Sequence, residues 1–162
     1  DRYEAYQYYL DAVKRDGVPY DLITKALPTI EGEVNNILAQ LVDFQMLFEM
    51  DGKNINNYIV YDDDNVWPLE LSSGMERFIS SLAIRVGLIN VSNLPRSNFL
   101  AIDEGWGTMD SDNLNSVYQL FQYLKTQFQF TLIVSHIESM RDAVDTLLEV
   151  KKEKGFSNIM FD

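Results

Sequence analysis

The sequence predicts an α/β fold in which mostly parallel strands are connected by crossover helices. Two short apolar runs, "FLAI" at residues 99–102 and "FTLIV" at residues 130–134, are typical of buried strands. Each run follows a segment whose apolar residues recur at helical spacing, at residues 70–91 and 111–124. This order of helix, strand, helix and strand is typical of a parallel sheet with crossover helices.

The first 43 residues are predicted to be helical, and residues 44–162 are predicted to form the main lobe. Residues 1–17 favour a helix with Gly17 as its C-cap. A second helix, with Pro28 near its start, carries one apolar face. That face consists of Ile30, Val34, Ile37, Leu38 and Leu41.

The remaining elements are predicted from alternation and turn residues. Apolar side chains alternate from Phe44 to Met50 and predict a strand, Asp51-Gly52 predicts a turn, and residues 58–61 predict a second strand. The acidic run at residues 62–64 is interpreted as a solvated turn. After residue 134 we expect a short helix at residues 138–143 and two final strands around residues 154–155. The strand at residues 130–134 is expected to be covered on both faces, because all but one of its residues are apolar.

Composition narrows the possible functions. The 162 residues are 46% apolar and carry 13 Lys and Arg against 25 Asp and Glu, which gives a net charge of -12. Such a surface does not bind nucleic acid by itself, so a DNA role requires a local patch or another polypeptide segment. The absence of cysteine excludes disulfides, thiolate metal sites and cysteine nucleophiles. No apolar run is long enough to span a bilayer, and a chain that opens at Asp1 is expected to be a fragment of a longer protein.

Three groups of residues have the chemistry of a nucleotide site. Asp103 and Glu104 end an apolar strand, and His136 follows the next one. In parallel sheets the active groups lie at the carboxyl ends of the strands, where a carboxylate can bind Mg²⁺ and a second one can activate water. Residues 72–74, Ser-Ser-Gly, begin a predicted helix, and helix N-termini bind phosphate readily. Each group alone also has an ordinary interpretation, as an acidic turn, a surface histidine or a serine N-cap.

Taken in order, these residues resemble the C-terminal half of an ABC-type ATPase head. "LSSGM" at residues 71–75 resembles the ABC signature motif, and "FLAIDE" at residues 99–104 resembles Walker B with its catalytic glutamate. "GTMD" at residues 107–110 resembles the D-loop, and "VSH" at residues 134–136 resembles the H-loop. Within that superfamily "DEGWGTMD" is most similar to the SbcC branch of SMC-like DNA double-strand-break repair ATPases. Residues 17–38 resemble the segment where the returning coiled coil of that branch enters the head, so residues 1–43 are expected to contain its end.

The resemblance implies ATP and Mg²⁺ as cofactors and assigns roles at the strand ends. Asp103 supports magnesium, Glu104 polarises the attacking water, and His136 holds the γ-phosphate. No G-x-x-x-x-G-K-[ST] loop occurs in the chain, so the phosphate cradle is expected from an N-terminal Walker A lobe. This chain alone is therefore expected to be inactive and to hydrolyse ATP only when that lobe completes it.

The resemblance also implies residues that act across a dimer of two heads. Ser72, Ser73 and Gly74 close over the ATP bound by the second copy, and Asp110 crosses the same interface. Ser73 stands where the signature usually has its first glycine, and Met75 replaces the last residue, so no role is assigned to Met75. Ser72 and Gly74 match the residues that the family uses on the phosphate.

For the whole protein, the resemblance implies ATP-driven dimerisation that regulates an SbcD-type metallophosphatase nuclease during repair and recombination of DNA. DNA is an expected partner and a membrane is not. The expected location is the cytoplasm or nucleoid, or the nucleus in a eukaryote, and the chain could be encoded by a virus. Two alternatives stay open: an SMC-type ATPase that tethers chromosomes, and a non-catalytic domain that binds a partner protein.

Overall fold

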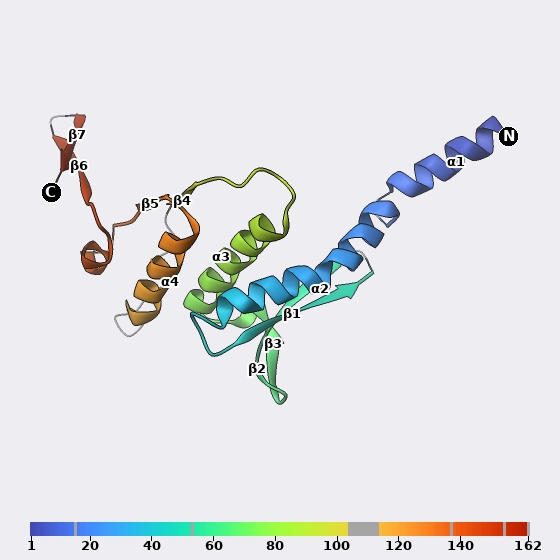
Figure 1. The fold of residues 1–162 in the computed structure, drawn as a ribbon, viewed down its shortest axis with the longest axis horizontal. Helices are drawn as coiled ribbons and strands as arrows, with labels where there is room; N and C mark the ends of the chain where they lie inside the picture. Colours follow the sequence, from blue (N-terminus) through green and yellow to red (C-terminus); the bar gives the residue numbers. More distant parts are fainter. Residues whose placement is uncertain (15, 53, 104–113, 137, 154, 162) are drawn as a thin grey trace. The chain divides into compact units, whose positions relative to one another are not determined.

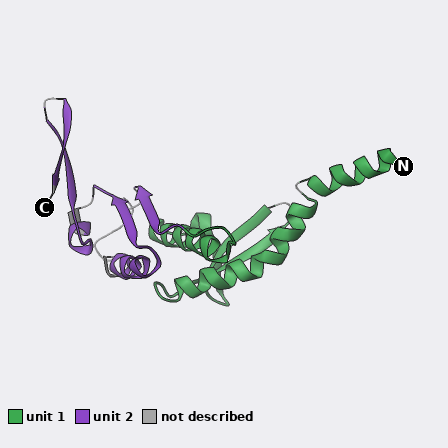
Figure 2. Ribbon diagram, turned by 45° about the horizontal axis from the view of Figure 1, so that its top comes forward, with its two compact units in different colours: residues 1–96 green, residues 97–162 purple. Residues whose placement is uncertain are grey.

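The computed structural model describes residues 1–14, 16–52, 54–103, 114–136, 138–153 and 155–161. Figure 1 labels the helices and strands along the chain. They fall into two compact units, residues 1–96 and residues 97–162, which are coloured separately in Figure 2. Each unit is described by itself below.

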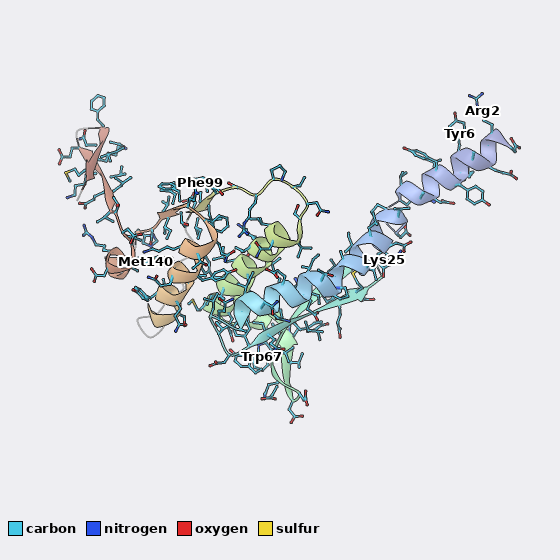
Figure 3. The ribbon with its side chains drawn as sticks, viewed as in Figure 1. Arg2, Tyr6, Lys25, Trp67, Phe99 and Met140 are labelled. Carbon is cyan, nitrogen blue, oxygen red and sulfur yellow. The ribbon has the colours of Figure 1, made fainter. Side chains whose placement is uncertain are left out.

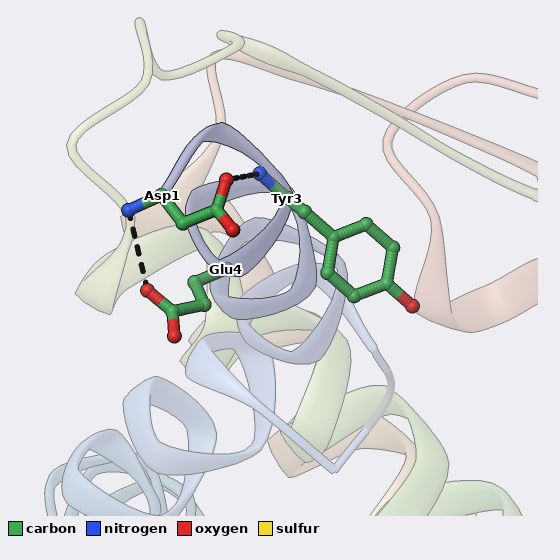
Figure 4. Close-up of polar contacts among 3 residues, drawn as sticks. All are labelled: Asp1, Tyr3 and Glu4. Atoms are coloured by element: carbon green, nitrogen blue, oxygen red, sulfur yellow. Dashed lines mark hydrogen bonds and ion pairs between the residues drawn. The ribbon is translucent and has the colours of Figure 1, made fainter.

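Unit 1 begins with two helices, α1 (Arg2–Val13) and α2 (Val18–Leu38). Asp1 caps α1: its carboxylate accepts a hydrogen bond from the Tyr3 amide, and its amino group contacts the Glu4 carboxylate at 3.3 Å (Figure 4). This is a capping box, which satisfies N–H groups that have no partner within the helix. No residue of α1 is buried, and Tyr6, labelled in Figure 3, is 58% exposed.

The junction between α1 and α2 differs from the sequence prediction. Gly17 is the N-cap of α2 and not the C-cap of α1, which ends at Val13. A Cβ atom at Gly17 would lie 2.5 Å from the carbonyl oxygens of Asp11 and Ala12, so this close backbone approach requires glycine. Pro28, predicted near the start of the helix, lies inside α2; the proline in the first turn is Pro19.

Three antiparallel strands follow, in the order β1-β2-β3. They are β1 (Gln45–Asp51), β2 (Asn54–Asp62) and β3 (Asn65–Pro68). The first two strands and the turn at Gly52, whose φ is +59°, confirm the prediction. The acidic turn is also confirmed, because the Asp62 carboxylate accepts hydrogen bonds from the Asp64 amide at 3.0 Å and the Asn65 side chain at 2.7 Å. The third strand beyond it was not predicted.

Side chains of α2 bind the backbone of β1. The Asn35 side chain donates to the Met46 carbonyl at 2.9 Å and accepts from the Met46 amide at 2.8 Å. The Glu31 carboxylate accepts from the Phe48 amide at 2.8 Å. The edge of β1 that faces away from β2 is therefore paired with side chains, which prevents it from pairing with another strand.

Helix α3 (Gly74–Val91), which follows the short 3₁₀ helix η1 (Leu69–Leu71), packs against α2. Gly87 allows the close contact, because a Cβ atom there would lie 3.0 Å from Val34 Cγ2. Both helices and the sheet contribute to one apolar core. Its most deeply buried side chains are Val34, Leu38, Met46, Ile59, Ile79 and Val86.

Unit 2 contains the predicted strand-helix-strand segment: β4 (Phe99–Asp103), α4 (Leu114–Gln127) and β5 (Phe130–Val134). The two strands are parallel, with Phe99 opposite Phe130 and Asp103 opposite Val134, so the predicted parallel connection is confirmed. The apolar face of α4 is buried at Val117, Leu120, Phe121 and Leu124. Residues 111–113, with which the predicted helix begins, lie outside the described residues.

One prediction for β5 is wrong: the strand is not covered on both faces. Every second residue points outward, and Phe130, Leu132 and Val134 are 58%, 38% and 47% exposed. On β4, Phe99 is 47% exposed and stacks on Phe130 with ring centroids 5.4 Å apart. The other face carries the buried Ile102. We call the exposed face, formed by Phe99, Ala101, Phe130, Leu132 and Val134, the outer face of the β4–β5 sheet.

The chain continues with the 3₁₀ helix η3 (Glu138–Ala143), where a short helix was predicted, and ends in an antiparallel hairpin. Its strands are β6 (Leu148–Glu153) and β7 (Phe156–Phe161), and Gly155 between them has a φ of +88°. Both final strands were predicted. A search of the described residues finds no helix with the length and apolar character needed to cross a membrane.

Candidate functional site

The segment that resembles the ABC signature lies at the start of α3. Ser73 is the N-cap: its hydroxyl accepts a hydrogen bond from the Glu76 amide at 3.3 Å, and its own amide donates to the Glu76 carboxylate at 2.6 Å. Gly74 is the first residue of the helix. The remaining free N–H groups of the first turn and the helix dipole make this end of α3 favourable for an anion.

The two neighbouring serines have different surroundings. Ser72 is 8% exposed, and its hydroxyl donates a 2.7 Å hydrogen bond to the Leu69 carbonyl within the turn of η1. Ser73 is exposed, and its hydroxyl accepts from the helix, which leaves its own proton available to donate. The structure thus keeps one serine inside the fold and presents the other at the surface.

Glu76 connects this helix start to the sheet. The Tyr61 hydroxyl donates a 2.6 Å hydrogen bond to the second oxygen of the Glu76 carboxylate. The Tyr61 ring lies between Phe44 and Trp67, with centroid distances of 5.6 and 5.5 Å. Trp67 is labelled on β3 in Figure 3.

The pKa values of both groups keep this hydrogen bond intact at neutral pH. Partial burial and the adjacent Glu76 carboxylate raise the pKa of Tyr61 to about 12, so the hydroxyl remains protonated. Partial burial acts to raise the pKa of Glu76, but hydrogen bonds from Ser73 and Tyr61 together outweigh it and lower that pKa. Glu76 therefore stays ionised and remains an acceptor.

In unit 2, the parallel register brings two predicted site residues to one edge of the sheet. Asp103 ends β4, and its partner Val134 ends β5. His136 follows two residues later, so Asp103 and His136 lie beyond the same carboxyl edge of the sheet, and both are exposed. Ser135 lies between the strand and His136, and its hydroxyl contacts the Met140 sulfur at 3.3 Å. An exposed carboxylate at a strand end is a hard oxygen ligand of the kind that Mg²⁺ prefers.

The other predicted residues are less completely placed. Glu104 and Asp110 lie outside the described residues. Ser72, Ser73 and Gly74 belong to unit 1, whereas Asp103 and His136 belong to unit 2. Within the described residues, no group of three or more Asp, Glu or His side chains could hold a metal ion by itself.

Sequence reasoning missed two residues of the signature segment, Glu76 and Tyr61. The spacing Ser73-x-x-Glu76 is the signal of a capping box, and it would have indicated Glu76. Tyr61 is 15 residues away in sequence and is brought to Glu76 by the fold alone, so no local pattern indicates it.

Comparisons with known proteins bear on the family and the fold of the chain. No protein-family model matches the chain. The uncharacterized protein R555 of Acanthamoeba polyphaga mimivirus is 36% identical over 171 residues, which cover 96% of this chain and 13% of that protein. The SbcC subunit of nuclease SbcCD from Deinococcus radiodurans is 32% identical over 107 residues, which cover 64% of this chain and 12% of that protein. The chain thus spans about an eighth of the length of these curated relatives.

Among solved structures, an SMC ATPase from work on ATP-driven dimerization and DNA-stimulated activation matches with a TM-score of 0.70. The two are 16% identical, and the match covers 87% of this chain and 88% of the other. The fold is therefore that of an SMC ATPase head, and the predicted α/β class is confirmed. Together with the sequence relatives, this places the chain as a C-terminal lobe of an SMC/SbcC-like ATPase head.

Proposed function

We propose that this lobe supplies part of a composite ATP-hydrolysing site in an SbcC-type DNA repair and recombination ATPase. In this proposal, ATP binding joins two heads, hydrolysis separates them, and the cycle regulates an SbcD-type metallophosphatase nuclease that processes DNA ends. The observation that carries the proposal is the parallel β4–β5 register, which brings Asp103 and His136 to the same edge of one sheet. That edge is where ligands bind in open parallel sheets.

At this edge three residues act on one nucleotide. Asp103 would hold Mg²⁺, and the ion would supply positive charge that neutralises the phosphates. Glu104, the next residue, orients and polarises the attacking water, and His136 contacts the γ-phosphate. Grouping these roles on two adjacent strand ends allows a rigid sheet to fix their spacing.

The signature segment acts on the nucleotide of the second head. The N-terminus of α3, with Ser72, Ser73 and Gly74, closes over the γ-phosphate held by the partner copy. Asp110 crosses the same interface. Because the shared ATP contacts both heads only when they are joined, its binding energy favours the dimer.

The phosphate cradle comes from an N-terminal Walker A lobe, and the outer face of the β4–β5 sheet supports this assignment. Phe99, Phe130, Leu132 and Val134 are all substantially exposed on that face. Sheets in α/β proteins are normally covered on both sides, so an apolar face of this kind requires another layer. A lobe that covers it would also bring its phosphate loop towards the sheet edge that carries Asp103.

The test is the Glu104→Gln variant in the complete head, where the Walker A lobe is present. ATP binding and dimerisation should persist, whereas hydrolysis should fall about 100-fold or more, because the water loses its oriented base. Glu153→Gln, which changes an exposed glutamate of β6, is the control and should hydrolyse ATP at the parent rate. Hydrolysis by Glu104→Gln at that same rate would show that Glu104 does not have this role.

An SMC-type tethering ATPase without a nuclease partner is the second candidate, because the matching solved structure is an SMC ATPase. The two candidates share the ATP site and differ in their partner. Affinity purification of the tagged full-length protein distinguishes them: a metallophosphatase-type nuclease should co-purify in the first case. Its absence, together with recovery of DNA-tethering activity, would favour the second.

A further inference from the structure

His136 lies between two anchored segments of unit 2. Strand β5 precedes it and is fixed by its parallel pairing with β4, and the 3₁₀ helix η3 follows it and contacts α4. We propose that Met140 of η3 is a positioning residue that holds His136 at the carboxyl edge of the sheet. The ion pair between Lys125 and Asp145 supports Met140 in this role. This inference rests on the proposed function of His136 and deepens it, because it identifies what fixes that residue.

The first step is the exposure of His136. Its side chain is exposed, and the strand before it ends two residues earlier, at Val134. An exposed side chain lacks the packing that would select one rotamer. In the proposed reaction the place of the imidazole matters, because a misplacement of about 1 Å costs about 100-fold in rate. The segment that carries His136 therefore needs an anchor beyond the strand.

Met140, labelled on η3 in Figure 3, supplies this anchor. It is only 5% exposed, whereas the next two side chains of the same short helix, Arg141 and Asp142, are exposed. The Ser135 hydroxyl donates to the Met140 sulfur at 3.3 Å. Because a thioether is a weak acceptor, the burial of Met140 contributes more to the anchor than this hydrogen bond does. Met140 thus connects the residue directly before His136 to the buried side of η3.

An ion pair ties the chain beyond η3 to the same helix. The Lys125 ammonium lies 2.7 Å from a carboxylate oxygen of Asp145. Lys125 is in the last turn of α4, and Asp145 follows η3 by two residues. The two side chains are 40% and 78% exposed, so the pair adds little to stability. Its effect is on geometry, because it fixes the far end of η3 against the helix that η3 already contacts.

Helix α4 is a suitable support because it is itself well packed. Its apolar face is buried, and it lies between β4 and β5 in the chain and contacts β5. Asp103 ends β4, and the segment of His136 follows β5 and is anchored on α4 through Met140. One packed unit therefore sets the spacing of Asp103 and His136, as a site built on rigid elements requires.

The experiment measures steady-state ATP hydrolysis by Met140 variants of the complete head. Met140→Ala should lower kcat about tenfold and leave the KM for ATP within about twofold, because in the proposed function the Walker A lobe still holds the phosphates. Met140→Leu keeps a buried side chain of similar volume and should stay within about twofold of the parent kcat. The assays use a temperature at which circular dichroism shows every variant to be folded.

A double-mutant cycle shows whether Met140 acts through His136. His136→Ala alone should lower kcat about 100-fold, and single-turnover assays extend the measurable range. Adding Met140→Ala should then lower kcat by less than about twofold more, since no imidazole remains to be positioned. A parent-level kcat for His136→Ala would overturn the proposed role of His136 itself. If His136→Ala is impaired, a full loss from Met140→Ala in both backgrounds, or no loss in the parent background, would overturn this inference alone.

A charge exchange at the surface tests the anchor without touching the core. Lys125→Glu and Asp145→Lys each put like charges opposite one another and should lower kcat about threefold, whereas the two substitutions together should restore it to within about twofold of the parent. Asp142→Lys makes the same charge change at an exposed position of η3 and should match the parent. A double exchange no better than the single variants, or Asp142→Lys as impaired as Asp145→Lys, would overturn the role given to the ion pair.

Discussion

The two units of the chain differ in how completely they bury their apolar surface. In unit 1, α2 and α3 pack together, and their core residues Val34, Leu38 and Ile79 are at most 1% exposed. In unit 2, α4 buries its apolar face, but the outer face of the β4–β5 sheet remains exposed, with Phe99 and Phe130 about half accessible. The core between α2, α3 and the three-stranded sheet of unit 1 is closed, whereas the sheet of unit 2 lacks a layer on one side.

This difference matters because of which residues each unit carries. Unit 1 carries the signature segment, which in the proposed function works at an interface with a second head and so must keep its shape before that head arrives. Unit 2 carries Asp103 and His136, which in the proposed function need a phosphate loop from another lobe. The unit with the missing layer is thus the one whose site is proposed to be completed by a further polypeptide segment.

Replacing one leucine by alanine in each unit tests this contrast and should give the largest effect. Leu38→Ala in unit 1 should lower the free energy of unfolding by about 2–5 kcal/mol, because it leaves a cavity in a closed core. Leu132→Ala on the outer face of the β4–β5 sheet should cost below about 1 kcal/mol in this chain, since Leu132 is 38% exposed. Urea titrations of both variants measure the difference. Equal losses would mean that the outer face is covered within the chain.

The second effect concerns the side chains that close the edge of β1. Asn35→Ala removes both hydrogen bonds to Met46 and leaves two partly buried backbone groups without partners. The expected loss of stability is about 1–3 kcal/mol. Asn36→Ala, an exposed neighbour on the same helix, should be neutral or slightly stabilising, because alanine favours the helix. A loss for Asn36→Ala as large as that for Asn35→Ala would argue that the two hydrogen bonds from Asn35 to Met46 do not stabilise the edge of β1.

The close packing of α2 and α3 predicts that alanine substitutions at two helical glycines differ in their effect on stability. Gly87→Ala puts a Cβ atom 3.0 Å from the buried Val34 side chain, whereas Gly32→Ala meets no atom within 4 Å. Both gain helix propensity of up to about 1 kcal/mol, so that term cancels between them. Gly87→Ala should therefore be less stable than Gly32→Ala by at least about 1 kcal/mol, measured by thermal unfolding. Similar stabilities would mean that the α2–α3 contact yields without cost.

How much of the fold the sequence could predict depends on how local the signal is. The parallel pair β4–β5 and the hairpin β6–β7 were predicted because apolar runs and turn residues lie within a few positions of each other. Strand β3 was missed because it has only four residues and ends in Pro68, which weakens any strand pattern. The two faces of β5 could not be separated, since a nearly all-apolar run carries no alternation that would mark its exposed side.

The residues of the candidate site also differ in whether a local sequence signal indicates them. The order of Ser-Ser-Gly, Asp-Glu and Ser-His along the chain indicated the type of site, because those residues lie next to strand ends and a helix start. Sequence could not separate Ser72 from Ser73, whose difference comes from the turn of η1 and the bond to Leu69. Nor could it find Tyr61, because its contact with Glu76 depends on packing between β2 and α3.

The smallest expected effect is a pH dependence at this contact. The pKa of Glu76 is lowered in the folded protein, so its contribution to stability is complete at pH values above the ordinary glutamate value of 4.5 and is lost as pH falls through the folded pKa. Denaturation midpoints measured from pH 7 towards pH 3 should therefore show Glu76→Gln less stable than the parent at pH 7, with the gap shrinking on acidification. Tyr61→Phe removes one of the hydrogen bonds that lower this pKa, and its stability should consequently depend on acid less steeply than that of the parent. A gap that stays constant over the whole range would mean that the Glu76 carboxylate charge contributes nothing to holding the start of α3, and that the loss in Glu76→Gln comes from the exchange of one acceptor oxygen for an NH₂ donor.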